Sequence, residues 1–136
     1  MKLMLDLNLL LDVVQRREPH YGASAQILSH VLEKRNGCIA AHAITTLHYL
    51  VAKHADRQKA DELVDWLLLN FAVAAVDGNT LQRARALQFS DFEDAVVSAC
   101  AEQQDCAFII TRNCRDFAQS SIAALTPGEF IAQRMN

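Results

Sequence analysis

Short, almost purely apolar runs alternate along this chain with longer segments in which leucine, isoleucine and valine recur at helical spacing. The apolar runs comprise residues 2–7, 38–41, 71–76, 106–110 and, more weakly, 122–125. A strand that is apolar throughout must be covered on both faces, as it is in a parallel sheet between layers of helices. The sequence therefore predicts an α/β fold with a central parallel sheet.

The segments between these runs carry the 3.6-residue period of amphipathic helices. We expect helices that begin near Asn8, over residues 24–35, from Ile44 onward, and over 59–70, 79–87 and 92–104, with a short last helix at Pro127. Asn36 and Gly37 end the second of these helices, as such residues commonly do. Each predicted strand is thus separated from the next by helical sequence, except at the weak last strand.

Length and composition predict one soluble domain over residues 1–136. The chain is 51% hydrophobic and 21% charged, with four Gly and two Pro, which leaves little room for linkers. No apolar run approaches the ~20 residues that cross a bilayer, and Asp6 and Asp12 interrupt the first run, so we expect no membrane segment or signal peptide. The four cysteines form no Cys-x-x-Cys pair, which favours reduced thiols in the cytoplasm.

Polar residues follow or precede the predicted strands at three separate places. One group lies at the carboxyl end of the first strand and in the turn after it, one precedes the fourth strand and one follows it. The residues are Asp6 and Asn8, then Asp91, Glu93 and Asp94, then Thr111, Arg112, Asn113 and Asp116. In parallel sheets, ligands bind outside the carboxyl ends of the strands, where the strand order reverses. We therefore expect these side chains to meet at one edge of the sheet.

Clustered carboxylates with few histidines or cysteines are typical of a site for a hard divalent cation, because Mg²⁺ and Mn²⁺ prefer oxygen ligands. A cation held in this way neutralises phosphate oxygens and lowers the pKa of a bound water molecule. Hydrolysis of a phosphodiester is the reaction that this chemistry favours. The net charge of −3 argues against nucleic-acid binding through the whole surface but leaves a local basic rim open.

Each acid also has an ordinary structural interpretation. Asp91 at a helix start is more often a cap than a ligand, and Asp94 in the first turn can interact with the helix dipole. Asn8 can cap the first helix, Asp116 can be a turn residue, and Asp12 is expected to be solvated. The convergence of three segments, rather than any single residue, carries the hypothesis of a site.

Three stretches resemble one known family: LMLDLNLLLDVV, DFEDAVVSACAEQQDCAFIITRNCRDF and LTPGEF. In this order they resemble the PIN-domain ribonucleases, including the VapC-type toxins of bacterial toxin and antitoxin pairs, over essentially the whole chain. The resemblance implies a three-layer α/β/α sandwich that cleaves RNA with Mg²⁺ or Mn²⁺. It also implies a small antitoxin partner and a homodimer.

By resemblance, the metal ligands are Asp6, Asp94 and Asp116, and Asn113 and Thr111 complete the catalytic set. Asn8, Asp91, Thr46 and Arg112 are expected to support the site or the substrate; Arg112 or Arg115 can meet a phosphate or be a solvated surface residue.

The family usually has an acid on the helix after the second strand, where this chain has the uncharged Thr46. His48 is two residues on and is rotated by ~200° around the helix, so it is a poor replacement. A missing acid leaves a second hypothesis open, a catalytically impaired module that binds RNA or protein. A phosphatase is a third, weaker hypothesis, because no Gly-rich phosphate loop is present.

Overall fold

The computed structural model describes residues 1–135. Its strands are β1 (Leu3–Leu5), β2 (Gly37–Ala40), β3 (Ala72–Ala74), β4 (Phe108–Ile110) and β5 (Ala124–Leu125). Its helices are α1 (Leu7–Val14), α2 (Tyr21–Lys34), α3 (Ala41–His54), α4 (Arg57–Asn70), α5 (Gly78–Ala86), α6 (Phe92–Gln103) and α7 (Pro127–Arg134), with a 3₁₀ turn η1 (Cys114–Phe117). Among these helices none is long and apolar enough to cross a membrane.

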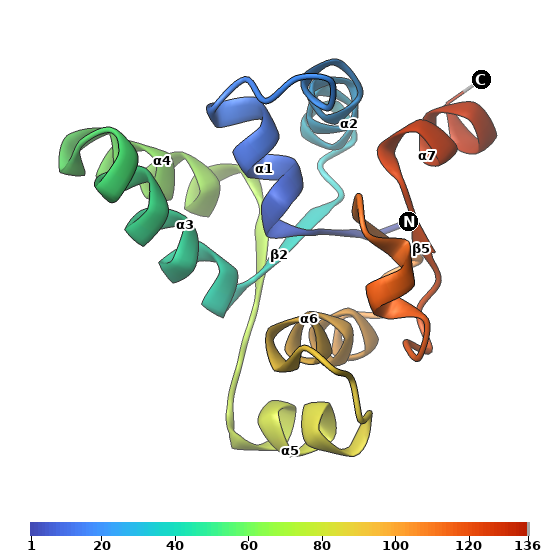
Figure 1. The fold of residues 1–136 in the computed structure, drawn as a ribbon. Coiled ribbons are helices and arrows are strands. Elements are labelled where there is room, and N and C mark those ends of the chain that lie inside the picture. Colours follow the sequence, from blue (N-terminus) through green and yellow to red (C-terminus); the bar gives the residue numbers. More distant parts are fainter. Residues whose placement is uncertain (136) are drawn as a thin grey trace.

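All five strands lie in one parallel sheet with the order β3-β2-β1-β4-β5. Figure 1 shows α5 and α6 on one side of the sheet and α1, α2 and α7 on the other, while the α3–α4 hairpin extends from one flank. The predicted α/β/α sandwich is therefore confirmed. Strand order reverses between β1 and β4, the place where such sheets bind ligands.

The core is built from the strands and the helix faces that cover them. Every residue of β1 and β2 is buried, and seven consecutive residues of α6 from Ala95 to Ala101 are buried as well. Small residues on α6 allow that helix to pack closely across β1, β2, β3 and β4. Its first turn is consequently held at the carboxyl edge of the sheet.

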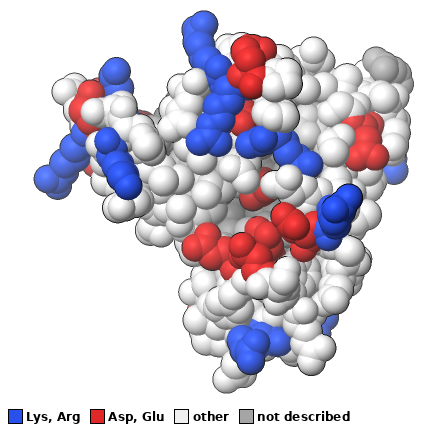
Figure 2. All heavy atoms as spheres, in the orientation of Figure 1, with Lys and Arg blue, Asp and Glu red and all other residues white. Residues whose placement is uncertain are grey.

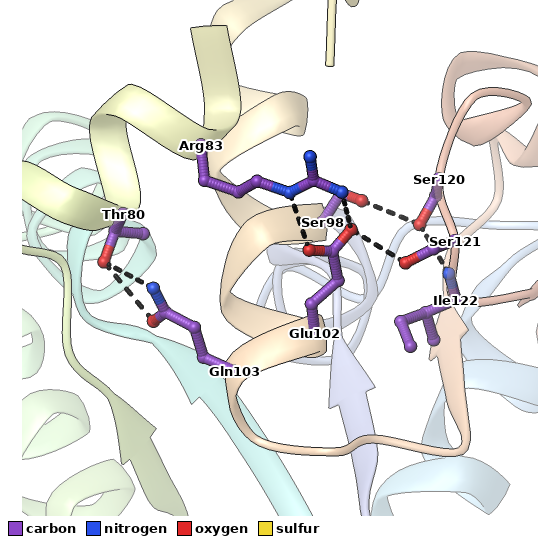
Figure 3. A network of polar contacts seen from close by, with 8 residues as sticks. All are labelled: Thr80, Arg83, Ser98, Glu102, Gln103, Ser120, Ser121 and Ile122. Carbon is purple, nitrogen blue, oxygen red and sulfur yellow. Dashed lines mark hydrogen bonds and ion pairs between the residues drawn. The ribbon is translucent and has the colours of Figure 1, made fainter. Parts of the chain in front are cut away.

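Figure 3 shows how polar contacts fix α6 to its neighbours. Arg83 on α5 makes a bidentate pair with Glu102, at 2.9 and 3.1 Å, and the hydroxyl of Ser121 donates to the same carboxylate at 2.7 Å. One turn earlier, the Ser98 hydroxyl donates to Ser120 Oγ at 2.7 Å. These contacts join α5 and the segment before β5 to one helix, which keeps α6 from rotating.

Two expectations about the first segment are wrong. Helix α1 begins at Leu7, so Asp6 occupies the cap position and Asn8 lies within the helix instead of capping it. Asp12 is completely buried, not solvated, because it faces inward from α1 and finds a cation and a hydroxyl there. The remaining boundaries differ by a few residues; α3, for example, begins at Ala41, ahead of Ile44.

Candidate active site

A cavity of about 280 Å³ lies at the carboxyl edge of the sheet, beside the point where the strand order reverses. Its polar lining comes from the start of α1, the start of α3, the start of α6 and η1: Asp6, Asn8, His42, Asp91, Glu93, Asp94, Asn113 and Asp116. Figure 2 shows acidic side chains gathered beside a hollow on this face, with basic side chains around its margin. Segments far apart in the sequence thus form one acidic pocket.

Asp6 is held between the two central strands. Its backbone N–H donates to the carbonyl of Ile110 at 3.0 Å, and its carboxylate accepts from the Thr111 hydroxyl at 2.7 Å. Burial raises the pKa of Asp6 above its ordinary value, while the Thr111 hydrogen bond and the positive charge of Arg112 oppose that rise. The Thr111 hydroxyl, itself buried, accepts from the backbone N–H of Asn113 at 3.1 Å and so orients the carboxylate.

Asp91 and Asp94 stand at the start of α6. The Asp91 carboxylate accepts from the backbone N–H of Asp94 at 3.1 Å, so the expected cap is confirmed, and Asp91 also lines the pocket. Burial raises the pKa of Asp94 to about 7, and repulsion from Asp91, Asp6 and Asp116 adds to the effect. Glu93 contributes as well, so four other carboxylates repel the charge of Asp94, and a cation would relieve this repulsion.

The fourth wall of the pocket is the turn after β4. Asn113 stands directly before η1, and Asp116 lies within that turn with its backbone N–H donating to the Asn113 carbonyl at 3.0 Å. Both residues line the cavity, and Phe117, which also borders it, anchors the turn in the core. The sequence suggested a simple turn here and did not indicate the 3₁₀ conformation that brings Asp116 to the acids.

Three expected residues, Thr111, Thr46 and Arg112, do not line this cavity; Thr111 is buried and acts on the pocket through its hydrogen bond to Asp6. Thr46 lies one helical turn beyond His42 on α3, and its hydroxyl donates back to the His42 carbonyl at 3.2 Å. Arg112 turns toward α1, where its Nε lies 3.0 Å from Asp12 Oδ2. Their assigned roles in the site stay predictions, and the observed partner of Arg112 is a buried acid.

His42 lines the pocket and was not among the residues singled out from the sequence. Its Nδ1 is buried without a hydrogen-bond partner in the described chain. Burial lowers the pKa of His42, and the neighbouring Glu93 carboxylate opposes that effect. The sequence could have indicated that His42 lies near the site. Residues 42 and 46 are four positions apart and therefore share one face of a helix, and position 46 is where the family usually has an acid.

Comparison with known proteins agrees with this geometry. A family model described as PIN domain matches residues 2–115. The chain belongs to the PIN domain family. The resemblance identified from the sequence is thereby confirmed.

One sequence relative and two solved structures illustrate what this PIN domain is similar to. "Ribonuclease VapC1" of Aquifex aeolicus (strain VF5) is 27% identical over 135 residues, which are 95% of this chain and 92% of that protein. Among solved structures, a toxin-antitoxin complex from Klebsiella pneumoniae has a TM-score of 0.71 at 21% identity and covers 93% of this chain and 98% of the other. VapBC2 from Rickettsia felis, bound to a promoter DNA fragment, has a TM-score of 0.71 at 15% identity and covers the same shares.

The donor set of this PIN domain fits the divalent cation that its family implies. Carboxylates and amide oxygens, the groups that Mg²⁺ and Mn²⁺ prefer, dominate the polar lining. Within residues 1–135, no three His, Cys, Asp or Glu side chains form a group that could hold an ion by themselves. Mg²⁺ ordinarily keeps several waters and binds through one or two carboxylates together with substrate phosphates, so an open acidic pocket suits it.

Proposed function

We propose that this chain is a divalent-metal-dependent ribonuclease that hydrolyses phosphodiester bonds in RNA, and that it serves as the toxin of a toxin–antitoxin pair. The observation that carries the proposal is the gathering of carboxylates from three segments around one cavity, where burial and, to a smaller extent, repulsion between the acids raise the pKa of Asp94 to about 7. A protein maintains such repulsion at a cost to its stability, and sites of this kind are commonly functional. The ribonuclease name of the Aquifex relative supports the same activity.

In this proposal, Asp6, Asp94 and Asp116 would share Mg²⁺ or Mn²⁺ with water molecules and a substrate phosphate, which complete the ligand set that the three carboxylates do not form alone. The bound cation would neutralise charge on the phosphate and lower the pKa of the attacking water. Thr111 keeps the Asp6 carboxylate in one orientation through its 2.7 Å hydrogen bond. The cation therefore meets a carboxylate whose position is already set.

The amide side chains complete the proposed substrate site. Asn8 on α1 and Asn113 in the turn after β4 line the cavity and could present hydrogen-bond donors to phosphate or ribose oxygens. Asp91 acts on the site indirectly: its carboxylate accepts a hydrogen bond from the backbone N–H of Asp94 and so helps to position that residue. Arg115, an exposed residue of η1, is a candidate for a phosphate contact.

The proposed partners are an RNA substrate, a small antitoxin protein and a second copy of this chain. An acidic pocket can be occupied by a cationic side chain of an inhibitor protein, which would compete with the metal. Solved structures with this fold include toxin–antitoxin complexes. In bacterial cells, expression of the wild-type chain should arrest growth and Asp94→Asn should not, and light scattering of the pure protein should give twice the mass of one chain.

The decisive experiment measures RNA cleavage with Mn²⁺ or Mg²⁺ and with excess chelator. We expect Asp6→Asn and Asp94→Asn to lower the rate by about a hundredfold or more, the scale of losing one charge-stabilising group. Asp65→Asn, an exposed acid on α4, is the matched control and should retain full activity. Cleavage that survives the chelator or the two pocket variants would contradict the proposal.

The presence of Thr46 favours a second candidate function, in which the chain binds RNA or a protein partner but does not hydrolyse RNA. The usual acid is absent there, and the Thr46 hydroxyl is occupied by the helix backbone. In that case calorimetry should detect no binding of Mn²⁺ at millimolar concentration, while RNA or partner binding persists. Metal-dependent cleavage by the wild-type chain would eliminate this candidate.

A further inference from the structure

Among the described side chains that line the pocket, His42 is the one whose nitrogen can act as a metal ligand, because the amide nitrogens of Asn8 and Asn113 have no free lone pair. His42 is the second residue of α3, is partly exposed, and lines the cavity beside Glu93 of α6. Its Nδ1 makes no hydrogen bond to any described residue. The polar neighbour that affects its pKa is Glu93, itself a residue of the pocket lining, and this contact leaves Nδ1 without a partner.

Another histidine of the same helix provides the contrast. His48 lies two turns further along α3 from the pocket, and its Nε2 is 2.7 Å from the Asp61 carboxylate on α4. That contact joins the two helices and accounts for a histidine at position 48. His42 has no equivalent contact, and its nearest acidic neighbours belong to the pocket.

We propose that His42 supplies an imidazole ligand to the divalent cation from the α3 side of the pocket, so that the site binds a first-row transition-metal ion such as Mn²⁺ in preference to Mg²⁺. This inference rests on the proposed metal-dependent function and names the donor that stands where the usual acid is missing. Imidazole binds transition metals readily, whereas Mg²⁺ selects oxygen donors.

The local geometry explains how a residue at position 42 can stand in for an acid at position 46. The two positions lie on the same helix face, and side chains on a helix tilt toward its N-terminus. A long acid at position 46 would therefore extend over the turn that carries His42. Thr46 is too short to do so and bonds to the backbone, which leaves that space to the imidazole.

The test uses the full chain and Mn²⁺ alone as the probe. Electron paramagnetic resonance gives the dissociation constant of Mn²⁺, and Mg²⁺ competition gives the preference between the ions. Electron spin echo envelope modulation detects a nitrogen atom bound directly to Mn²⁺, so the wild-type protein can be examined before any residue is mutated. We expect an imidazole signal in the wild type, and His42→Ala should remove it and raise the Mn²⁺ dissociation constant by about tenfold or more, with a smaller change for Mg²⁺.

The controls separate this inference from the proposed function. The His48→Ala variant should keep the nitrogen signal and the wild-type affinity for Mn²⁺. The Asp6→Asn variant should bind both Mn²⁺ and Mg²⁺ more weakly. An Mn²⁺ complex that depends on Asp6 but shows no imidazole signal would overturn the role of His42 and leave the metal site intact. A wild-type chain that binds neither ion would overturn the metal-dependent function, and this inference with it.

Discussion

Asp12 and Arg112 form an ion pair in which the carboxylate is completely buried and the arginine side chain is 24% exposed. The Arg112 Nε lies 3.0 Å from Asp12 Oδ2, and the same oxygen accepts from the Ser24 hydroxyl at 3.2 Å. The pair joins α1 to the segment after β4, so the two segments that bear Asp6 and Asn113 are held together behind the pocket. Arg112 thus has a structural partner on the far side of the acids.

Removing one member of this pair should destabilise the fold strongly. We expect Arg112→Ala to lower the free energy of unfolding by about 3–5 kcal/mol, because it leaves a buried carboxylate without its cation. Urea unfolding at neutral pH gives the value. Arg115→Ala, which changes an exposed arginine three residues on, is the control and should change stability by less than about 0.5 kcal/mol. Equal stability of the two variants would show that the ion pair is not needed.

Asp94 should make the metal-free protein more stable in mild acid. Because burial and neighbouring acids raise the pKa of Asp94 from 3.8 to about 7, the folded state binds more protons than the unfolded state between these values. Stability then falls as the pH rises through this window. Asp94→Asn removes the charge, so at pH 8 we expect a gain of about 1–3 kcal/mol, given ~1.4 kcal/mol per pKa unit and some screening by water in the open cavity.

Urea unfolding with chelator present, at pH 5 and pH 8, measures this difference. Asp65→Asn is the control, and its stability should follow that of the wild type at both pH values. If Asp94→Asn is no more stable than the wild type at pH 8, the carboxylates do not repel one another as the geometry indicates.

Gly37 should not tolerate a side chain. A Cβ atom at this position, the start of β2, would lie 2.6 and 2.7 Å from two ring carbons of Phe71. That ring is buried and packs edge-on against Trp66, so we expect Gly37→Ala to cost about 1–3 kcal/mol. In the control, Gly22→Ala, the Cβ meets nothing within 4 Å on α2, and stability should rise by up to ~1 kcal/mol. Thermal unfolding measures the stability of both variants, and equal stability of Gly37→Ala and the wild type would contradict the prediction.

Thr46→Glu should shift the metal preference toward Mg²⁺. The new carboxylate would extend along α3 toward His42 and the pocket, adding one oxygen donor and one negative charge. We expect the Mg²⁺ dissociation constant, measured by calorimetry, to fall by about tenfold, or ~1.4 kcal/mol. Thr45→Glu adds the same charge on an exposed position of the same helix, and an equal effect there would point to net charge rather than coordination.

The fold and most of the acids were accessible from the sequence, because apolar runs and helical periods report burial directly. Parallel strands place their carboxyl ends at one edge, so Asp6, Asp94 and the residues after β4 could be expected to meet. Motif resemblance indicated the family and the absent acid at Thr46. The assignment of Asp12 to solvent was wrong because a sequence does not show which distant cation will accompany an inward-facing acid.

By itself, then, the sequence determined the α/β architecture, the acidic edge and the family. Tertiary structure decided which side chains face the cavity: it turned Arg112 away to Asp12, brought Asp116 in through a 3₁₀ turn, and placed His42 among the acids. These outcomes depend on contacts between residues up to a hundred positions apart. Local periodicity does not encode such contacts, because they arise only when the packed sheet brings the ends of its strands together.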